Sequence, residues 1–169
     1  SSLVTGVQTC ALPISFPNSL LTYYHKPSDV QNNSQGAYNY VGEVNNLYDF
    51  GYGLSYSEFK YSNMILNKLE YSESDTIEMS VNLKNMSDIP GYETIQVYSS
   101  DLFASITPDI TRLRRFSKVY LKGGEEKTIK FTLPINELAF VNYNNEYVVE
   151  PGKFKISIGG LIQEILVKI

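Results

Sequence analysis

Six carboxylic side chains in the second half of the chain are of the types that perform general acid–base chemistry: Asp101, Asp109, Glu125, Glu126, Glu137 and Glu150. Such chemistry needs an acid and a base that both reach the same reacting group. Glu125 and Glu150 fall in turns of the sequence, which favours structural roles, and we expect the other four on a solvated surface. The pattern therefore predicts no catalytic residue in this chain.

The single histidine, His25, could act as a base or as a metal ligand. It stands between Tyr and Pro-Ser residues, where a solvated or packing role is the more common outcome. A metal site would need further His or Cys ligands nearby, and Cys10 is the only cysteine, so no intrachain disulfide can form. Six glycines lack the Lys-Ser/Thr pair and the following helix of a phosphate loop, and we interpret them as turns: Gly51, Gly53, Gly123, Gly124, Gly159 and Gly160. The sequence predicts neither a metal nor a cofactor.

Tyrosine is concentrated in the first third of the chain, at Tyr23, Tyr24, Tyr38, Tyr40, Tyr48, Tyr52 and Tyr56. Aromatic faces can stack on sugar rings, so a saccharide platform is one interpretation. The other is that these rings wedge between domains, and the absence of Trp favours it. These tyrosines do not identify a substrate-binding residue. A stand-alone carbohydrate-binding or adhesion module remains the alternative function. That alternative requires an exposed aromatic row on one sheet face.

Composition indicates a folded β protein without a nucleic-acid or membrane partner. Apolar residues make up 43% of the 169 residues and charged residues 19%, as in globular proteins. The formal charge is −4 with Lys and Glu interleaved, so no basic stripe is available to neutralise phosphates. The longest apolar runs are far shorter than the roughly 20 residues that cross a bilayer.

From Phe59 onward, apolar and polar residues alternate in short runs separated by turns. Ile77, Met79, Val81 and Leu83 give the clearest run with period 2. Further runs lie at 95–100, 116–121, 129–133, 146–149, 154–158 and 162–169, with turns roughly every 8–12 residues as in an antiparallel sandwich. We expect an all-β, immunoglobulin-like antiparallel β-sandwich of about seven strands over residues 57–169, without a useful helical period. Asn32 and Asn85 begin Asn-X-Ser triplets, a glycosylation pattern that often arises by chance.

The chain before residue 50 shows no strand or helix pattern. Residues 4–14 match one translated frame of a common sequencing-library adapter, so we expect residues 1–14 to be non-native and the reading frame to be truncated upstream. Residues 15–50 are rich in Asn, Ser, Tyr and Pro, show no sustained period of 2 or 3.6, and are interpreted as an irregular extended segment within a domain tail and linker at 15–56. Such a long structureless stretch is unusual within a compact domain, which suggests the tail of a preceding domain and a linker.

Several separated strings resemble the C-terminal part of family 3 glycoside hydrolases of the β-glucosidase type. Residues 47–56, Leu-Tyr-Asp-Phe-Gly-Tyr-Gly-Leu-Ser-Tyr, resemble the family junction LYPFGYGLSY, with Asp49 in place of proline. Residues 23–28, 113–125, 138–140 and 149–160 resemble further family signatures in the correct order. Arg112 and Arg115 depart from the family's usual Glu and Gly, at a position we expect to be exposed. The resemblance covers roughly residues 15–160.

This resemblance implies a three-part retaining hydrolase. In the family, a barrel domain carries the aspartate nucleophile, an α/β domain carries the glutamate acid/base, and a fibronectin type III-like domain packs against both. Both catalytic carboxylates lie in family segments outside this chain, so no catalytic residue is carried over and the chain alone is predicted to be inactive. The implied partners are the barrel and α/β domains of the same parent chain. An oligo- or polysaccharide partner and a secreted or periplasmic location of the parent stay open, because no basic signal-peptide region begins the chain.

Overall fold

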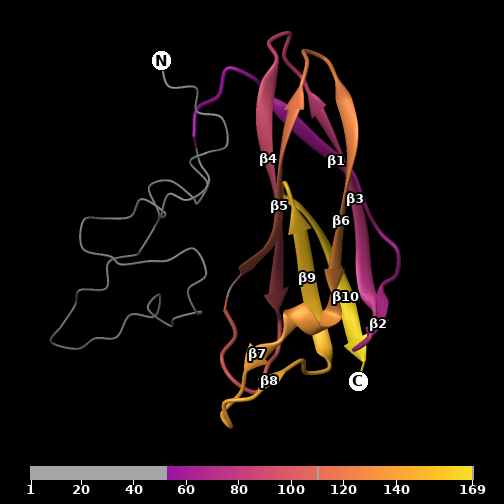
Figure 1. Cartoon of the computed structure of the whole chain (residues 1–169), viewed down its shortest axis with the longest axis vertical. Helices are drawn as coiled ribbons and strands as arrows, with labels where there is room; N and C mark the ends of the chain where they lie inside the picture. The colour runs from indigo at the N-terminus through magenta and orange to yellow at the C-terminus, as the bar shows by residue number, and fades with distance from the viewer. Residues whose placement is uncertain (1–52, 110, 169) are drawn as a thin grey trace, which may run out of the picture.

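A computed structural model describes residues 53–168 except residue 110, and these residues form two packed β-sheets (Figure 1). The first sheet has the strand order β1-β3-β6, with β1 Phe59–Leu66, β3 Thr76–Asn85 and β6 Glu126–Pro134. The second has the order β2-β10-β9-β4-β5, with β2 Glu70–Ser72, β10 Leu161–Lys168, β9 Gly152–Ile158, β4 Gly91–Asp101 and β5 Arg112–Leu121. A small hairpin joins β7 Phe140–Val141 to β8 Tyr147–Val148.

The alternating side chains explain this arrangement. On β3, Ile77, Met79, Val81 and Leu83 are buried while the residues between them face outward. Ile95 and Val97 of β4 and three residues of β9 oppose them from the second sheet, at Phe154, Ile156 and Ile158. Two inner faces of period 2 thus form one core between the sheets. The expected all-β sandwich is confirmed, with seven longer strands.

Two short elements differ from the expectation. β2 pairs with β10 in parallel, whereas the sequence predicted only antiparallel pairing. A 3-10 helix, η3 Ile135–Leu138, follows Pro134, where we expected no helix. Both elements are too short to show a period in the sequence. In β1 the alternation is loose because the register shifts between Ser62 and Ile65, with Asn63 at a φ of 53°.

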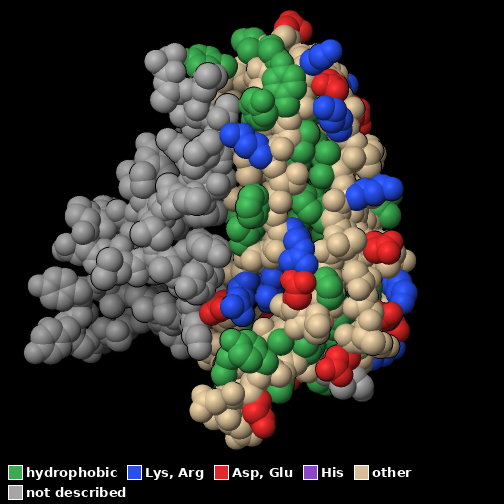
Figure 2. All heavy atoms as spheres, in the orientation of Figure 1, with side chains coloured by type: hydrophobic (Ala, Val, Ile, Leu, Met, Phe, Trp, Pro, Cys, Tyr) green, Lys and Arg blue, Asp and Glu red, His purple; other side chains and the backbone are tan. Residues whose placement is uncertain are grey.

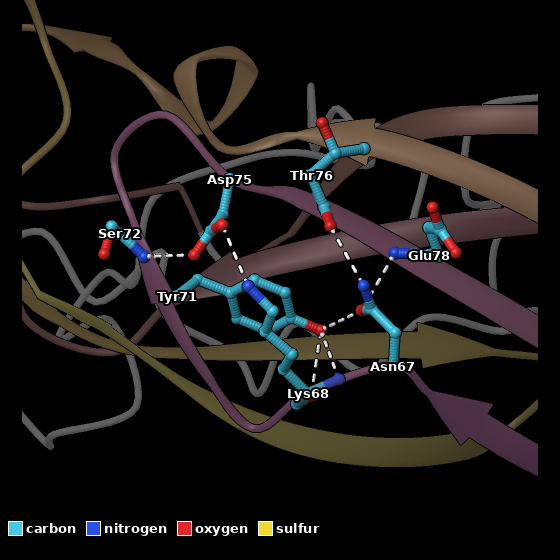
Figure 3. Close-up of polar contacts among 7 residues, drawn as sticks. All are labelled: Asn67, Lys68, Tyr71, Ser72, Asp75, Thr76 and Glu78. Atoms are coloured by element: carbon cyan, nitrogen blue, oxygen red, sulfur yellow. Dashed lines mark hydrogen bonds and ion pairs between the residues drawn. The ribbon is translucent and has the colours of Figure 1, made fainter.

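A polar network fixes the corner at which the chain leaves the first sheet for the second (Figure 3). The Tyr71 hydroxyl, almost fully buried, lies 2.7 Å from Asn67 Oδ1 and 2.8 Å from the Lys68 carbonyl oxygen, its two possible acceptors. Asn67 Oδ1 also accepts from the Glu78 amide at 3.1 Å. Asp75 accepts from the Ser72 amide at 2.8 Å and pairs with Lys68 at 2.9 Å. The Ser72 amide and then Lys68 lower the pKa of Asp75. These bonds tie β1, β2 and β3 together.

The predictions for the adapter-like residues 1–14, and for residues 15–52 with His25 and Asn32, lie outside the described residues and stay predictions. The division at residue 57 also stays a prediction, although the first strand begins at Phe59. Between residues 53 and 168, none of the helices is long and apolar enough to span a membrane.

The two-sheet core makes a matched pair of isoleucine substitutions informative. Ile156→Ala on β9 should lower the free energy of unfolding by about 2–5 kcal/mol, because it leaves a cavity at a fully buried site. Ile162→Ala on β10 should change it by less than about 0.5 kcal/mol, because that side chain is 60% exposed. Urea unfolding followed by circular dichroism measures both, and similar losses would contradict the assigned faces.

Candidate functional site

The six carboxylates singled out in the sequence are spread over the surface, and each has its own partner. Glu125 accepts from the Lys122 amide at 2.7 Å within its turn, and Glu150 accepts from the Ser105 amide at 2.8 Å, 45 positions away in the sequence. Asp101 accepts from the Phe103 amide, Asp109 pairs with Arg112, and Glu126 contacts the Asn82 amide. In residues 53–168 no group of three His, Cys, Asp or Glu residues could hold a metal.

Glu137 lies on the exposed surface, and it also forms an ion pair that the sequence did not predict. Its two oxygens accept from Arg115 Nη1 and Nη2 at 2.7 and 2.6 Å, a bidentate ion pair. These hydrogen bonds lower the pKa of Glu137 and raise that of Arg115. Arg115 Nε also donates to the Thr132 carbonyl oxygen of β6 at 2.9 Å. Arg115 is thus half-buried rather than freely exposed as expected, whereas Arg112 is exposed.

A β-bulge explains how two consecutive arginines serve the same contact. Val97 pairs with Arg115 and Tyr98 with Leu113, so Arg114 is the extra residue of β5. Arg114 Nε donates to Ser99 Oγ at 2.7 Å and its Nη1 to the Glu137 carbonyl oxygen at 2.5 Å. Burial is the main cause that lowers the pKa of Arg114 to about 10. Both arginines therefore fasten β5 to η3.

A cleft of about 170 Å³ lies beside this contact. Ser99, Asp101 and Asp109 line it together with Arg112, Arg114 and Phe140. Asp101 is half-buried rather than fully solvated, and burial raises its pKa. Arg112 Nε lies 3.6 Å from Asp109 Oδ2, so the rim of the cleft holds an ion pair of its own. Cationic, carboxylate and apolar side chains line the cleft. Of its two carboxylates, Asp101 accepts a hydrogen bond from a backbone amide and Asp109 pairs with Arg112.

The outer face of β4 and β5 carries a group of exposed aromatic side chains, here called the aromatic face: Tyr92, Phe116 and Tyr120, with Lys118 between them. Phe116 is 70% exposed, and Tyr92 pairs in register with Tyr120. Figure 2 shows hydrophobic side chains in its upper part and a cluster of basic and acidic side chains farther down the same view. The run expected at 116–121 did not separate the outward residue Phe116 from Val119 and Leu121, which face the core.

The rings of the aromatic face do not form a flat platform. The Tyr92 and Tyr120 ring centroids are 5.0 Å apart, and the ring planes are tilted by 56°. Lys118 Nζ lies over the Tyr92 ring, 5.1 Å from its centroid, in a cation–π contact. One ring face is thus already occupied by a cation. Of the tyrosines chosen from the sequence, Tyr56 is exposed and the other six lie outside the described residues.

Two further sequence features have structural roles. Asn85, which begins a glycosylation triplet, is fully buried, and its side chain binds the Ile89 carbonyl oxygen and the Ser87 amide. A buried, engaged amide is no acceptor for a glycan. Gly159 has a φ of 56°, and a Cβ there would lie 2.2 Å from the Tyr61 ring. It is a turn residue, as predicted, and it also makes room for a ring that donates a hydrogen bond to Glu93 at 2.7 Å.

Comparison with known proteins places these features in context. Residues 93–161 match the model of the fibronectin type III-like domain. The chain is 36% identical over 157 residues to a periplasmic β-glucosidase of Salmonella typhimurium, covering 88% of this chain and 20% of that protein. It is 36% identical to a β-xylosidase of Formosa agariphila, covering 88% and 21%. A β-glucosidase of Listeria innocua in complex with glucose superposes with a TM-score of 0.74 at 35% identity, covering 87% and 22%.

The Arg115–Glu137 pair predicts a pH-dependent contribution to stability. Because folding lowers the pKa of Glu137, its stabilisation is complete above the unfolded pKa of about 4.3 and is lost as the pH falls below it. At pH 7, Glu137→Gln should lower the free energy of unfolding by about 1 kcal/mol, the upper range for a partly exposed pair. Urea unfolding at pH 7 and near pH 2 measures the difference, which should vanish at the lower pH.

Glu126→Gln is the matched control, because Glu126 contacts only an amide within the described part of the chain. Its effect at pH 7 should stay below about 0.5 kcal/mol. An equal cost of Glu137→Gln at both pH values would show that the ion pair does not act through its charge.

Proposed function

The chain carries the fibronectin type III-like domain of a family 3 glycoside hydrolase, and from that premise we propose that it supports the catalytic domains of a β-glucosidase-type parent enzyme. It spans about a fifth of the length of the relatives that it matches. We propose that the remaining four fifths of such a parent hold the barrel and α/β domains that the resemblance implies, and that these domains are the partners of the sandwich.

The match of the sandwich to one fifth of larger glycosidases is the observation that carries this proposal. The parent's proposed reaction is hydrolysis of a terminal β-linked sugar with retention of configuration. That reaction needs two carboxyl groups about 5–5.5 Å apart across the scissile bond. The six carboxylates weighed above are each engaged by an amide or a cation, which supports a non-catalytic role for residues 53–168.

A stand-alone carbohydrate-binding module is the second candidate, because the exposed aromatic residues of β4 and β5 meet its main requirement. Two features count against it. The tilt between Tyr92 and Tyr120 prevents both rings from lying on one flat sugar surface, and Lys118 covers one ring. The supporting role is therefore preferred. The sugar of the parent stays unassigned, since one relative is a β-glucosidase and another a β-xylosidase.

A chimera tests the supporting role. In the Salmonella β-glucosidase, the segment that matches residues 53–169 would be exchanged for these residues. We expect the chimera to hydrolyse aryl β-glucosides, because the sandwich supplies the surface on which the catalytic part rests. An enzyme that lacks the segment should lose soluble activity by at least about tenfold, equivalent to about 1.4 kcal/mol. Undiminished activity without the segment would contradict the proposal.

The purified 169-residue chain provides the complementary measurement. It should neither release nitrophenol from aryl β-glycosides nor sediment with insoluble glucan or xylan. Turnover that disappears when one carboxylate among residues 53–168 is replaced by its amide would refute the non-catalytic assignment. Sedimentation with polysaccharide that is lost in Phe116→Ala would support the binding module instead.

A further inference from the structure

The cleft of about 170 Å³ lies at the end of the sandwich where β4 ends and β5 begins. Figure 1 shows the loop after β4 and the hairpin of β7 and β8 at this same end, the lower end in the view. Four strands contribute to the lining, with Ser99 and Asp101 from β4, Arg114 from β5, Phe140 from β7 and Phe154 from β9. A partly apolar hollow on which a few polar side chains converge has the usual make-up of a small-molecule site.

Two polar side chains of the cleft, Asp101 and Arg114, have hydrogen-bonding groups that the described residues do not use. Asp101 accepts the Phe103 amide through Oδ1, and Arg114 donates through Nε and Nη1. Within the described part of the chain, Asp101 Oδ2 and Arg114 Nη2 have no partner and are available to a ligand. Arg114 Nε binds Ser99, which precedes Asp101 by two residues on β4, or about 7 Å along the strand. An acceptor and a donor therefore lie about one small ring apart.

The charges around the cleft balance, which disfavours a charged ligand. Arg112 and Arg114 supply two cations, and Asp101 and Asp109 supply two carboxylates. Burial and, more weakly, the charge of Glu150 raise the pKa of Asp101, so an added anion would meet further repulsion. An added cation would meet the two arginines. An uncharged ligand with hydroxyl groups avoids both, because a hydroxyl can accept from Arg114 and donate to Asp101.

The volume and the apolar wall of the cleft indicate a single ring as the occupant. A cavity of about 150 Å³ holds one benzene molecule, and this cleft has a similar volume of about 170 Å³. Phe140 is half-buried in its wall, and an aromatic side chain suits the C–H face of a sugar ring. We propose that this cleft, here called the sugar cleft, binds one uncharged sugar ring. Asp101 and Arg114 bind its hydroxyl groups, and Phe140 packs against its apolar face.

The choice of a sugar rests on the proposed function, because a parent that cleaves terminal β-linked sugars releases single sugar rings next to the sandwich. The sugar cleft is separate from the aromatic face and holds one ring rather than a polysaccharide chain. A ligand of this size, held by a few hydrogen bonds, binds with a Kd on the order of 1 mM. Such binding is compatible with the expected failure of the chain to sediment with insoluble glucan or xylan.

Amide chemical shifts of the full 169-residue chain, titrated with methyl β-D-glucoside or methyl β-D-xyloside, test the proposal. We expect saturable shifts within residues 99–109, 112–114 and 138–141, with a Kd on the order of 1 mM. Asp101→Asn should weaken binding about tenfold, because it removes the charge that strengthens a hydrogen bond from a sugar hydroxyl. The new amide oxygen can still accept from the Phe103 amide, so the turn after β4 keeps its bond.

Two further variants separate the sugar cleft from the rest of the surface. Phe140→Ala should weaken binding several-fold, because it removes the wall against which the ring packs. Phe116→Ala, on the aromatic face, is the matched control and should leave the Kd unchanged. Circular dichroism verifies that each variant keeps its β structure, and Phe140→Ala provides an independent test should Asp101→Asn unfold.

Three results would overturn the proposal. The first is the absence of saturation up to about 100 mM of either sugar, a hundredfold above the expected Kd. The second is saturation by sodium acetate but by neither sugar, which would identify a carboxylate site. The third is saturable binding that Phe116→Ala abolishes and Asp101→Asn leaves intact, which would place the sugar on the aromatic face. The chimera assay judges the supporting role separately, since an active chimera without sugar binding by the chain would contradict the sugar cleft alone.

Discussion

The extra residue of β5, Arg114, determines how the edge of the sandwich is held together. It also determines which side chains of β5 face outward. β5 and β6 belong to different sheets, so side chains must hold them together where the two sheets end. The bulge turns Arg114 and Arg115 to the same contact, where they bind the carbonyl and the carboxylate of Glu137 and, through Arg115, the Thr132 carbonyl. Beyond the bulge the alternation restarts with Phe116, Lys118 and Tyr120 outward. The same β-bulge therefore positions the arginine contacts with Glu137 and sets the outward direction of the aromatic face.

The main strands could be predicted because their burial repeats every second residue. Ile77 to Leu83 and Phe154 to Ile158 show this period in the sequence and in the structure. The parallel strand β2 and helix η3 could not be predicted, since three and four residues are too few to show a period. The outward direction of Phe116 was not predicted, although this residue differs in parity from Val119 and Leu121, a signal that could have separated the two faces.

The contacts of the candidate site depend on long-range pairing that the sequence does not reveal. Arg115 and Glu137 are separated by 22 positions, and only the docking of η3 against β5 brings them together. Asp101 and Asp109 share a cleft because the loop after β4 folds back toward β5. By contrast, the turn role of Glu125 followed from local sequence, because it accepts the amide of Lys122 three residues before it. Glu150 belongs with the long-range contacts, since its partner Ser105 lies 45 positions away. A fold of this kind hosts many functions, so the glycosidase assignment depends on relatives rather than on a reaction centre among residues 53–168.

Differential scanning calorimetry of the Salmonella chimera tests the central claim most directly. A sandwich that supports the catalytic part through a shared interface should unfold with it in one cooperative transition, at a temperature different from that of the isolated chain. A separate transition at the temperature of the isolated chain would show an independent module, and would contradict the account.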